Sequence, residues 1–286
     1  MRNILFGLSG KIDPRTVETL RVVKEIADSL DIPFFIVGAS ARDFVPTYCY
    51  GVEARRATKD IDLGIEVAGW DKFTEFKNAL IAAGRFTLDP REPQRLYFDS
   101  VPVDIVPFGP IAKQNGKISW PPDHKVYMSL RGFREAYENS ITVKISSRPD
   151  LCIKLPTIAG LALMKLISWE ERYPERKKDA EDLILIMNSC EEISMDRLYE
   201  QEPALLESEE FNLGHAAVRL LGRDMAKIAD PDALKIIRQA LEQELNPDAP
   251  YRLIQDMIGT GFGFENRFDE LLGQIEKLTK GLNEET

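Results

Sequence analysis

Cysteine and histidine are scarce in this sequence, and their scarcity argues against several kinds of chemistry. The 286 residues include three cysteines and two histidines. Cys49, Cys152 and Cys190 are far apart and lack the paired spacing of a zinc site or a disulfide framework. His124 and His215 are too few for a His-based metal site and make a Ser-His-Asp triad a poor candidate. This inventory suits hard, oxygen-ligated cations best.

The sequence also lacks a long hydrophobic run and an excess of positive charge. No stretch approaches the roughly 18 apolar residues that a membrane span needs. The start "MRNILFGLSGKIDPR" has neither the long apolar region nor the cleavage site of a signal peptide, so we expect a cytoplasmic protein without membrane contact. The formal net charge of −10 opposes a broad nucleic-acid surface, so any nucleic-acid contact must be local.

The hydrophobic patterns change in character near residue 150. Before it, apolar runs typical of strands alternate with helical patterns, which predicts an α+β fold, a mixed sheet with packed helices. After it, every segment has helical periodicity, punctuated by proline or glycine. We therefore expect a catalytic domain over residues 1–150, followed by an all-helical C-terminal domain over residues 151–286 that recognises an acceptor or a partner.

Two aspartates one residue apart interrupt an apolar segment. In "ATKDIDLGI", residues 57–65, Asp60 and Asp62 alternate with apolar side chains. Side chains at positions i and i+2 of a strand point to the same face, so both carboxylates would lie opposite the apolar face. Two carboxylates this close repel each other unless a cation lies between them. By itself the pattern also fits an ordinary strand start with solvated acids.

A glycine turn and a third aspartate accompany this pair. Gly38 follows the apolar run "IPFFIV" and precedes a helical pattern, a junction whose N–H groups can bind a phosphate. Ser40 adds a hydroxyl donor, and Arg42 adds a bidentate phosphate partner. Asp104 lies between apolar neighbours in "PVDIV", where an unpaired buried carboxylate would be costly. Three acids on neighbouring strands beside a phosphate-binding turn predict a site with the three aspartates as ligands of two Mg²⁺ ions.

This order of parts resembles the DNA polymerase β-like nucleotidyltransferase superfamily. Its pattern is a G-[GS] turn that opens a helix, a D-x-D strand, and a third Asp on a following strand. The matching segments are "VGAS", "DID" and "VDIV", within residues 34–107. Ala39 interrupts the usual pair, and the long gap from Ser40 to Asp60 leaves "TYCYGVEARRA" as an insertion. The resemblance implies transfer of a nucleotide from an NTP, the donor substrate, with Mg²⁺.

A second segment resembles the abortive-infection (AbiEii-type) nucleotidyltransferase toxins and their uncharacterised relatives. Their K…R…KDxxD(L) pattern is matched in "LALMKLISWEERYPERKKDAEDL". The matching positions are Lys165, Arg172, Lys178, Asp179 and Asp182. This resemblance implies nucleotide transfer, in some members onto tRNA ends, a toxin or phage-defence role, and an antitoxin partner protein. It reaches to about residue 190.

The KDxxD segment has both a structural and a catalytic interpretation. Residues 183–187 are five consecutive apolar side chains, so the helix that carries them should be buried from its second turn on. Asp179 and Asp182 share a face with Ile186 and should enter an interior or a cleft. Either these acids form a structural ion pair with a basic residue of the segment, or Lys165 contacts the triphosphate while Asp179 positions the acceptor or that lysine.

Two alternatives stand beside the nucleotidyltransferase prediction. "VGASARD" also resembles the VGGxVRD segment of CCA-adding and poly(A)-type polymerases, although their EDxxR-type element is not visible here. The other alternative is a catalytically idle NTP-binding or regulatory module, which would follow if the insertion after Ser40 misplaced the phosphate turn. The sequence defines neither the NTP base nor the acceptor. Transfer to a tRNA, to a protein hydroxyl or to a small alcohol such as an aminoglycoside would use the same NTP-binding part of the site.

Overall fold

The chain divides into two compact units, Met1–Thr157 and Ile158–Thr286. The structure is a computed structural model that describes residues 5–51, 60–114, 116–259 and 264–284. The first unit combines helices with three sheets, and the described part of the second contains helices but no strand. The predicted fold class, α+β followed by all-helical, is therefore confirmed. None of the described helices is long and apolar enough to cross a membrane.

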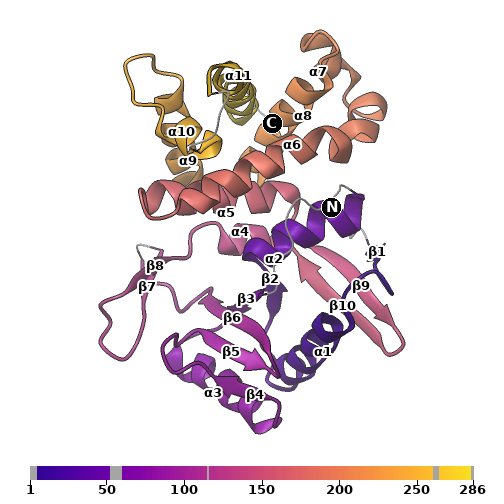
Figure 1. The fold of residues 1–286 in the computed structure, drawn as a ribbon, viewed down its shortest axis with the longest axis vertical. Helices are drawn as coiled ribbons and strands as arrows, with labels where there is room; N and C mark the ends of the chain where they lie inside the picture. Colours follow the sequence, from indigo (N-terminus) through magenta and orange to yellow (C-terminus); the bar gives the residue numbers. More distant parts are fainter. Residues whose placement is uncertain (1–4, 52–59, 115, 260–263, 285–286) are drawn as a thin grey trace. The chain divides into compact units, whose positions relative to one another are not determined.

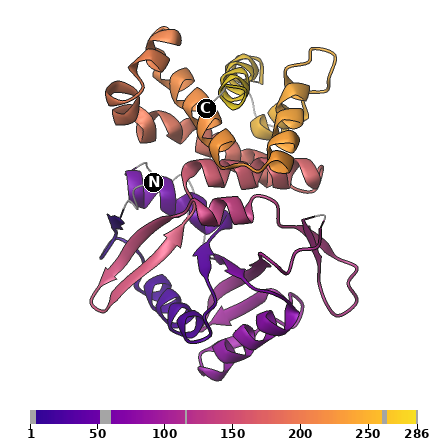
Figure 2. The same ribbon diagram turned by 180° about the vertical axis from the view of Figure 1, so that it is seen from behind.

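A five-stranded mixed sheet forms the centre of the first unit (Figure 1). Its order is β2-β3-β6-β5-β4, and β3 and β6 pair in parallel while the other neighbours pair antiparallel. Its strands are β2 (Phe34–Ile36), β3 (Ile61–Glu66), β4 (Phe86–Leu88), β5 (Arg95–Phe98) and β6 (Val101–Phe108). The two longer helices of the unit, α1 (Pro14–Ser29) and α3 (Trp70–Ala82), contact each other and lie beside this sheet, as Figure 2 also shows.

The alternation along β3 and β6 places the acids away from the core. Ile61 and Leu63 of β3 and Val103 of β6 are buried, whereas Asp62 and Asp104 are partly exposed. Successive side chains of a strand point to opposite faces, so the aspartates share the face that the apolar side chains leave. The predicted strand around the D-x-D motif is thus confirmed as β3, and "QRLYFDS" and "VPVDIVPFG" form the hairpin of β5 and β6.

Smaller elements complete the first unit. A three-stranded sheet contains β1 (Leu5–Gly7), β9 (Ile141–Ser147) and β10 (Asp150–Leu155), and a hairpin contains β7 (Lys117–Ser119) and β8 (Tyr127–Ser129). Helix α4 covers Phe133–Glu138. The short helix expected after Gly38 is present as α2 (Gly38–Asp43) and continues into a π-helix, η1 (Phe44–Cys49). The later part of the predicted insertion, residues 52–57, lies outside the described residues.

The second unit packs its helices around α8. Its helices are α5 (Ile158–Glu171), α6 (Lys177–Glu200), α7 (Pro203–Ser208), α8 (Leu213–Ile228), α9 (Pro231–Glu244), α10 (Arg252–Ile258) and α11 (Phe264–Leu282). Helix α5 ends before Pro174 and α6 begins after it. Helices α5, α6 and α11 all contact α8. Gly222 and Gly281 permit the close approach of α8 and α11, since a Cβ on either would lie within 2.3 Å of a backbone oxygen of the other helix.

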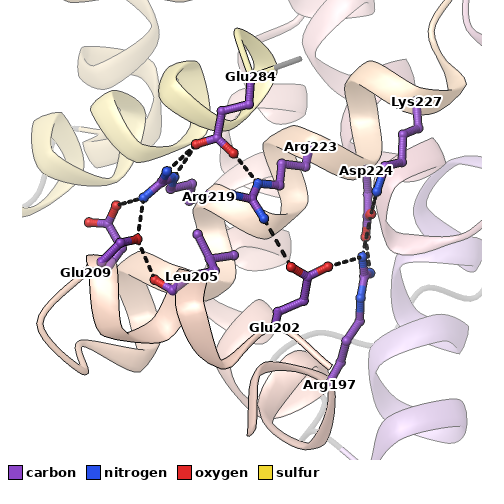
Figure 3. A network of polar contacts seen from close by, with 10 residues as sticks. Arg197, Glu202, Leu205, Glu209, Arg219, Arg223, Asp224, Lys227 and Glu284 are labelled. Atoms are coloured by element: carbon purple, nitrogen blue, oxygen red, sulfur yellow. Dashed lines mark hydrogen bonds and ion pairs between the residues drawn. The ribbon is translucent and has the colours of Figure 1, made fainter. Parts of the chain in front are cut away.

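A chain of ion pairs also joins α7, α8 and the end of α11 (Figure 3). Arg219 of α8 binds both Glu209, which follows α7, and Glu284, which follows α11. Arg223, one turn further along α8, binds Glu284 as well and reaches Glu202 at 3.1 Å. Each acid is thus held by two cations or more, which fixes these helix ends to one another.

Candidate active site

Asp62 and Asp104 lie directly opposite each other in the central sheet. They are Cα partners in the parallel register of β3 and β6. Asp60 is the last residue before β3, on the side of the sheet where Asp62 projects. The side chain of Asp60 is 39% exposed and that of Asp104 is 18% exposed. Solvent therefore reaches the acids, and the structure brings the three predicted aspartates to one end of one strand pair.

A basic residue that sequence reasoning missed, Arg95 of β5, holds two of these acids together. Its Nε donates to Oδ1 of Asp104 at 2.7 Å, and its Nη2 donates to Oδ2 of Asp104 at 2.6 Å. The same Nη2 lies 3.3 Å from Oδ2 of Asp60. The hydrogen bonds that Arg95 donates to Asp104 and the charges of Asp104 and Asp60 together raise the pKa of Arg95, even though burial opposes them. The cation that offsets the repulsion between the Asp60 and Asp104 carboxylates is therefore the Arg95 guanidinium.

The position of Arg95 could have been read from the sequence. Asp99 and Ser100 form a two-residue turn between the paired strands β5 and β6. Counting back from that turn pairs Arg95 with Asp104, which is the register observed. Opposite charges on directly paired residues attract each other across a sheet.

The Gly38 turn meets Asp62 rather than open solvent. Gly38 has φ +61°, and a Cβ on it would lie 2.6 Å from Oδ2 of Asp62. That oxygen accepts hydrogen bonds from the backbone N–H groups of Ala39 at 3.0 Å and Ser40 at 3.3 Å. Only glycine fits here, because both the positive φ and the close carboxylate exclude a side chain. The turn predicted to bind a phosphate holds the carboxylate of Asp62 in this structure.

Ser40 and Arg42 make contacts inside the unit. The buried Ser40 hydroxyl accepts a hydrogen bond from the backbone N–H of Asp62 at 2.9 Å and donates to the backbone oxygen of Val37 at 3.0 Å. It therefore fixes β3 against the start of α2. Arg42 is buried, and its Nε donates to Oδ1 of Asp43 at 2.8 Å. The predicted phosphate-binding roles of both residues stay predictions.

Three of the predicted residues of the second unit form a buried cluster, whereas Arg172 instead pairs with Glu175. Lys165 of α5 donates to Asp179 at 3.0 Å and to Asp182 at 2.5 Å, and Arg176 donates to Asp179 at 2.7 Å. Lys165, Asp179 and Asp182 are all buried, so the prediction that these acids enter an interior is confirmed. Burial by itself lowers the pKa of Lys165, but the charges of Asp179 and Asp182 outweigh it and raise that pKa.

The carboxylate oxygens around Arg95 are suitable ligands for a divalent cation. In the parts of the chain that the structure describes, no three His, Cys, Asp or Glu side chains are arranged to hold a metal ion. Asp60 and Asp104 are nevertheless hard oxygen donors of the kind that Mg²⁺ prefers, and they already hold one cation between them. A metal ion would need the oxygens that Arg95 now contacts.

Comparisons with known proteins add a set of distant structural likenesses. No family model matches the sequence, and no curated protein matches it either. The chain is similar to ANT(2'')-Ia in complex with adenylyl-2''-tobramycin, at 16% identity and a TM-score of 0.35 over 68% of this chain and 98% of that one. An antigenic nucleotidyltransferase-like protein from Paracoccidioides brasiliensis matches at 17% identity, with a TM-score of 0.39 over 70% and 93% of the two chains. The CCA-adding enzyme of Thermotoga maritima complexed with tRNA matches at 13%, with a TM-score of 0.28 over 96% and 82%. These values do not assign the chain to a family, and its own residues carry the function proposed below.

Proposed function

We propose that this protein is a Mg²⁺-dependent nucleotidyltransferase that moves a nucleotide monophosphate from an NTP to a hydroxyl acceptor. The observation that supports it most is the position of the three aspartates. Asp62 and Asp104 are partners across the parallel strand pair, and Asp60 joins Asp104 through one shared cation. Oxygen donors from three aspartates on this strand pair, two of them joined by one cation, are the groups that metal-assisted phosphoryl transfer needs most.

The residues of the first unit have distinct roles in this proposal. Asp60, Asp62 and Asp104 would hold the metal ions, which when bound neutralise the triphosphate and activate the acceptor hydroxyl. Ser40 positions Asp62, because its hydroxyl bonds the backbone N–H of that residue. Gly38 leaves room for the Asp62 carboxylate. Arg42 stays a proposed partner of the triphosphate.

The charge of the helical unit bears on the acceptor. Residues 158–286 contain 15 Lys and Arg against 27 Asp and Glu, a formal charge of −12, whereas residues 1–157 contain 22 against 20. A polyanion such as tRNA is repelled by a surface of this sign, and a cation is attracted. We therefore favour a small hydroxylated cation, of the aminoglycoside kind, over tRNA. The toxin role and the antitoxin partner rest on the sequence resemblance alone.

A transfer assay with matched variants tests this function. The chain would be incubated with each α-labelled NTP, Mg²⁺ or Mn²⁺, and total cell extract, and the labelled fraction identified. Asp62→Asn and Asp104→Asn should each reduce incorporation by about a hundredfold or more, because each removes a proposed metal ligand. Glu66→Gln is the control, since Glu66 is a carboxylate of the same strand away from the three aspartates. Equal incorporation by all these chains would contradict the proposal.

One observation favours a second candidate, an NTP-binding module without catalysis. Arg95 already satisfies Asp104, and the Gly38 turn already satisfies Asp62, so the site is electrostatically complete without metal. Under this alternative, NTP with Mg²⁺ would raise the melting temperature while no fraction of the extract took up label. Incorporation of label from any NTP excludes it.

A further inference from the structure

The proposed function gives roles to the three aspartates but none to Arg95, the charged residue that contacts two of them. Arg95 is held at both ends: its backbone pairs with that of Asp104 in the β5–β6 hairpin, and its guanidinium makes two hydrogen bonds to the same residue. Its side chain is 27% exposed. The sheet therefore sets where the guanidinium lies, and no long or mobile connection is needed to bring it to the acids.

The oxygens that Arg95 contacts are those that a divalent cation would need. Oδ2 of Asp60 and both oxygens of Asp104 face the guanidinium. A metal ion on these oxygens would lie within a few ångströms of a fixed positive charge, and such repulsion is strong at a partly buried site. The guanidinium and a metal ion are therefore mutually exclusive partners of Asp104.

We propose that Arg95 is a built-in competitor of the metal, which holds Asp60 and Asp104 in the metal-free chain and leaves them when a divalent cation binds. This inference rests on the proposed function, because it takes the aspartates as metal ligands. It makes Arg95 a positioning residue: it prevents the acids from repelling each other before the metal arrives, and it sets how tightly the metal is held.

A second acceptor for the released guanidinium lies along the same strand. Tyr97 is two residues from Arg95 on β5, so the two side chains share a face. The Tyr97 hydroxyl donates to Oδ2 of Asp89 at 2.9 Å. The charge of Arg95 contributes to lowering the pKa of Asp89, after the hydrogen bonds from the Arg91 backbone and from Tyr97. A guanidinium that leaves Asp104 keeps an acidic neighbour.

Binding of Mn²⁺ alone to the full-length chain tests this inference without nucleotide or turnover. Free Mn²⁺ would be followed by electron paramagnetic resonance for the wild type, Arg95→Gln, Arg95→Lys and a control, Arg85→Gln. Arg85 is a matched control because it bridges two acids, Glu18 and Asp99, elsewhere in the same unit. We expect Arg95→Gln to bind Mn²⁺ about tenfold more tightly than the wild type, since it removes one adjacent positive charge. Arg95→Lys, which keeps the charge, and Arg85→Gln should stay within about threefold of the wild type.

A second measurement keeps the test decisive if Arg95→Gln does not fold. In ¹⁵N-labelled wild type, the Nε–H signal of Arg95 should shift when Mg²⁺ is added, while that of Arg85 stays in place. An unchanged Arg95 signal, or equal Mn²⁺ affinity of the wild type and Arg95→Gln, overturns the inference and leaves the proposed function standing. The Arg95 effect without incorporation of label overturns the proposed function alone. No Mn²⁺ binding by any variant overturns both.

Discussion

At Gly38, both the backbone conformation and the neighbouring atoms favour glycine. Its positive φ is one constraint, and the 2.6 Å that would separate a Cβ from Oδ2 of Asp62 is another. Gly84 has a positive φ of 85° with nothing near the place of its missing side chain, so it isolates the conformational cost. Comparison of the two glycines separates backbone strain from loss of space beside the carboxylate.

We expect Gly84→Ala to lower the free energy of unfolding by about 1 kcal/mol through the left-handed φ alone. Gly38→Ala should cost about 3 kcal/mol, because the Asp62 carboxylate must also move. Urea unfolding of both variants measures the difference. Equal losses would mean that Asp62 moves away freely, and the close fit of the Gly38 turn would then have no energetic consequence.

The helices α5 and α6 are joined by a buried cluster whose charges balance. Lys165 and Arg176 face Asp179 and Asp182, and the lysine donates to both acids. We expect Asp179→Asn to lower the free energy of unfolding by about 3 kcal/mol, because it leaves buried Lys165 with one acid. Glu175→Gln, which breaks only the exposed pair with Arg172, should cost less than about 1 kcal/mol. Unchanged stability of Asp179→Asn with lost nucleotide transfer would instead support the catalytic role predicted for this residue.

The ends of α7, α8 and α11 are tied by Glu209, and this contact predicts a dependence on pH. Burial alone would raise the pKa of Glu209, but hydrogen bonds from Lys277, Lys280 and Arg219 outweigh it and lower that pKa from 4.5 to about 2. A pKa that is lower in the folded chain means that the ionised form stabilises the fold. This contribution is fully present above pH 4.5 and is lost as the pH falls toward 2.

We therefore expect Glu209→Gln to lower the free energy of unfolding by about 2 to 3 kcal/mol at pH 7. The difference from the wild type should stay constant from pH 7 to about pH 5 and shrink below pH 4.5. Urea unfolding at several pH values gives this profile. A difference that is already shrinking between pH 7 and pH 5 would contradict the assignment to Glu209.

At the scale of elements, sequence reasoning succeeded where the signal is local. The apolar alternation around Asp62 predicted β3, and the five apolar residues after Asp182 predicted the buried turns of α6. The prediction that this helix is buried from its second turn on is wrong beyond Cys190, where Met195 and Tyr199 are exposed. The three-residue strands β4, β7 and β8 are too short to show a period, and the π-helix after α2 has no distinctive pattern. Arg95 was not predicted, because its place beside Asp104 depends on cross-strand pairing rather than on a local pattern, although the two-residue turn specifies that pairing.

At the scale of the molecule, the two units differ most in their charge. The first has a formal charge near neutrality, whereas the helical unit carries −12. The aspartates lie in the first unit, so the donor half of the proposed reaction would depend on residues outside the acidic part of the chain. In the proposed function, the excess of acids in the helical unit would select among acceptors, because long-range charge governs encounter rather than fold.

This asymmetry predicts where label goes in the transfer assay with cell extract. A cationic small alcohol should become labelled, so the product should pass an ultrafiltration membrane and bind a cation-exchange resin. Its labelling rate should fall as salt is raised from about 50 to about 200 mM, because screening weakens attraction to the acidic unit. Treatment of the extract with ribonuclease or with protease beforehand should leave the label unchanged. Loss of label after ribonuclease would instead assign an RNA acceptor, and a local basic contact in the first unit would then have to overcome the charge of the helical one.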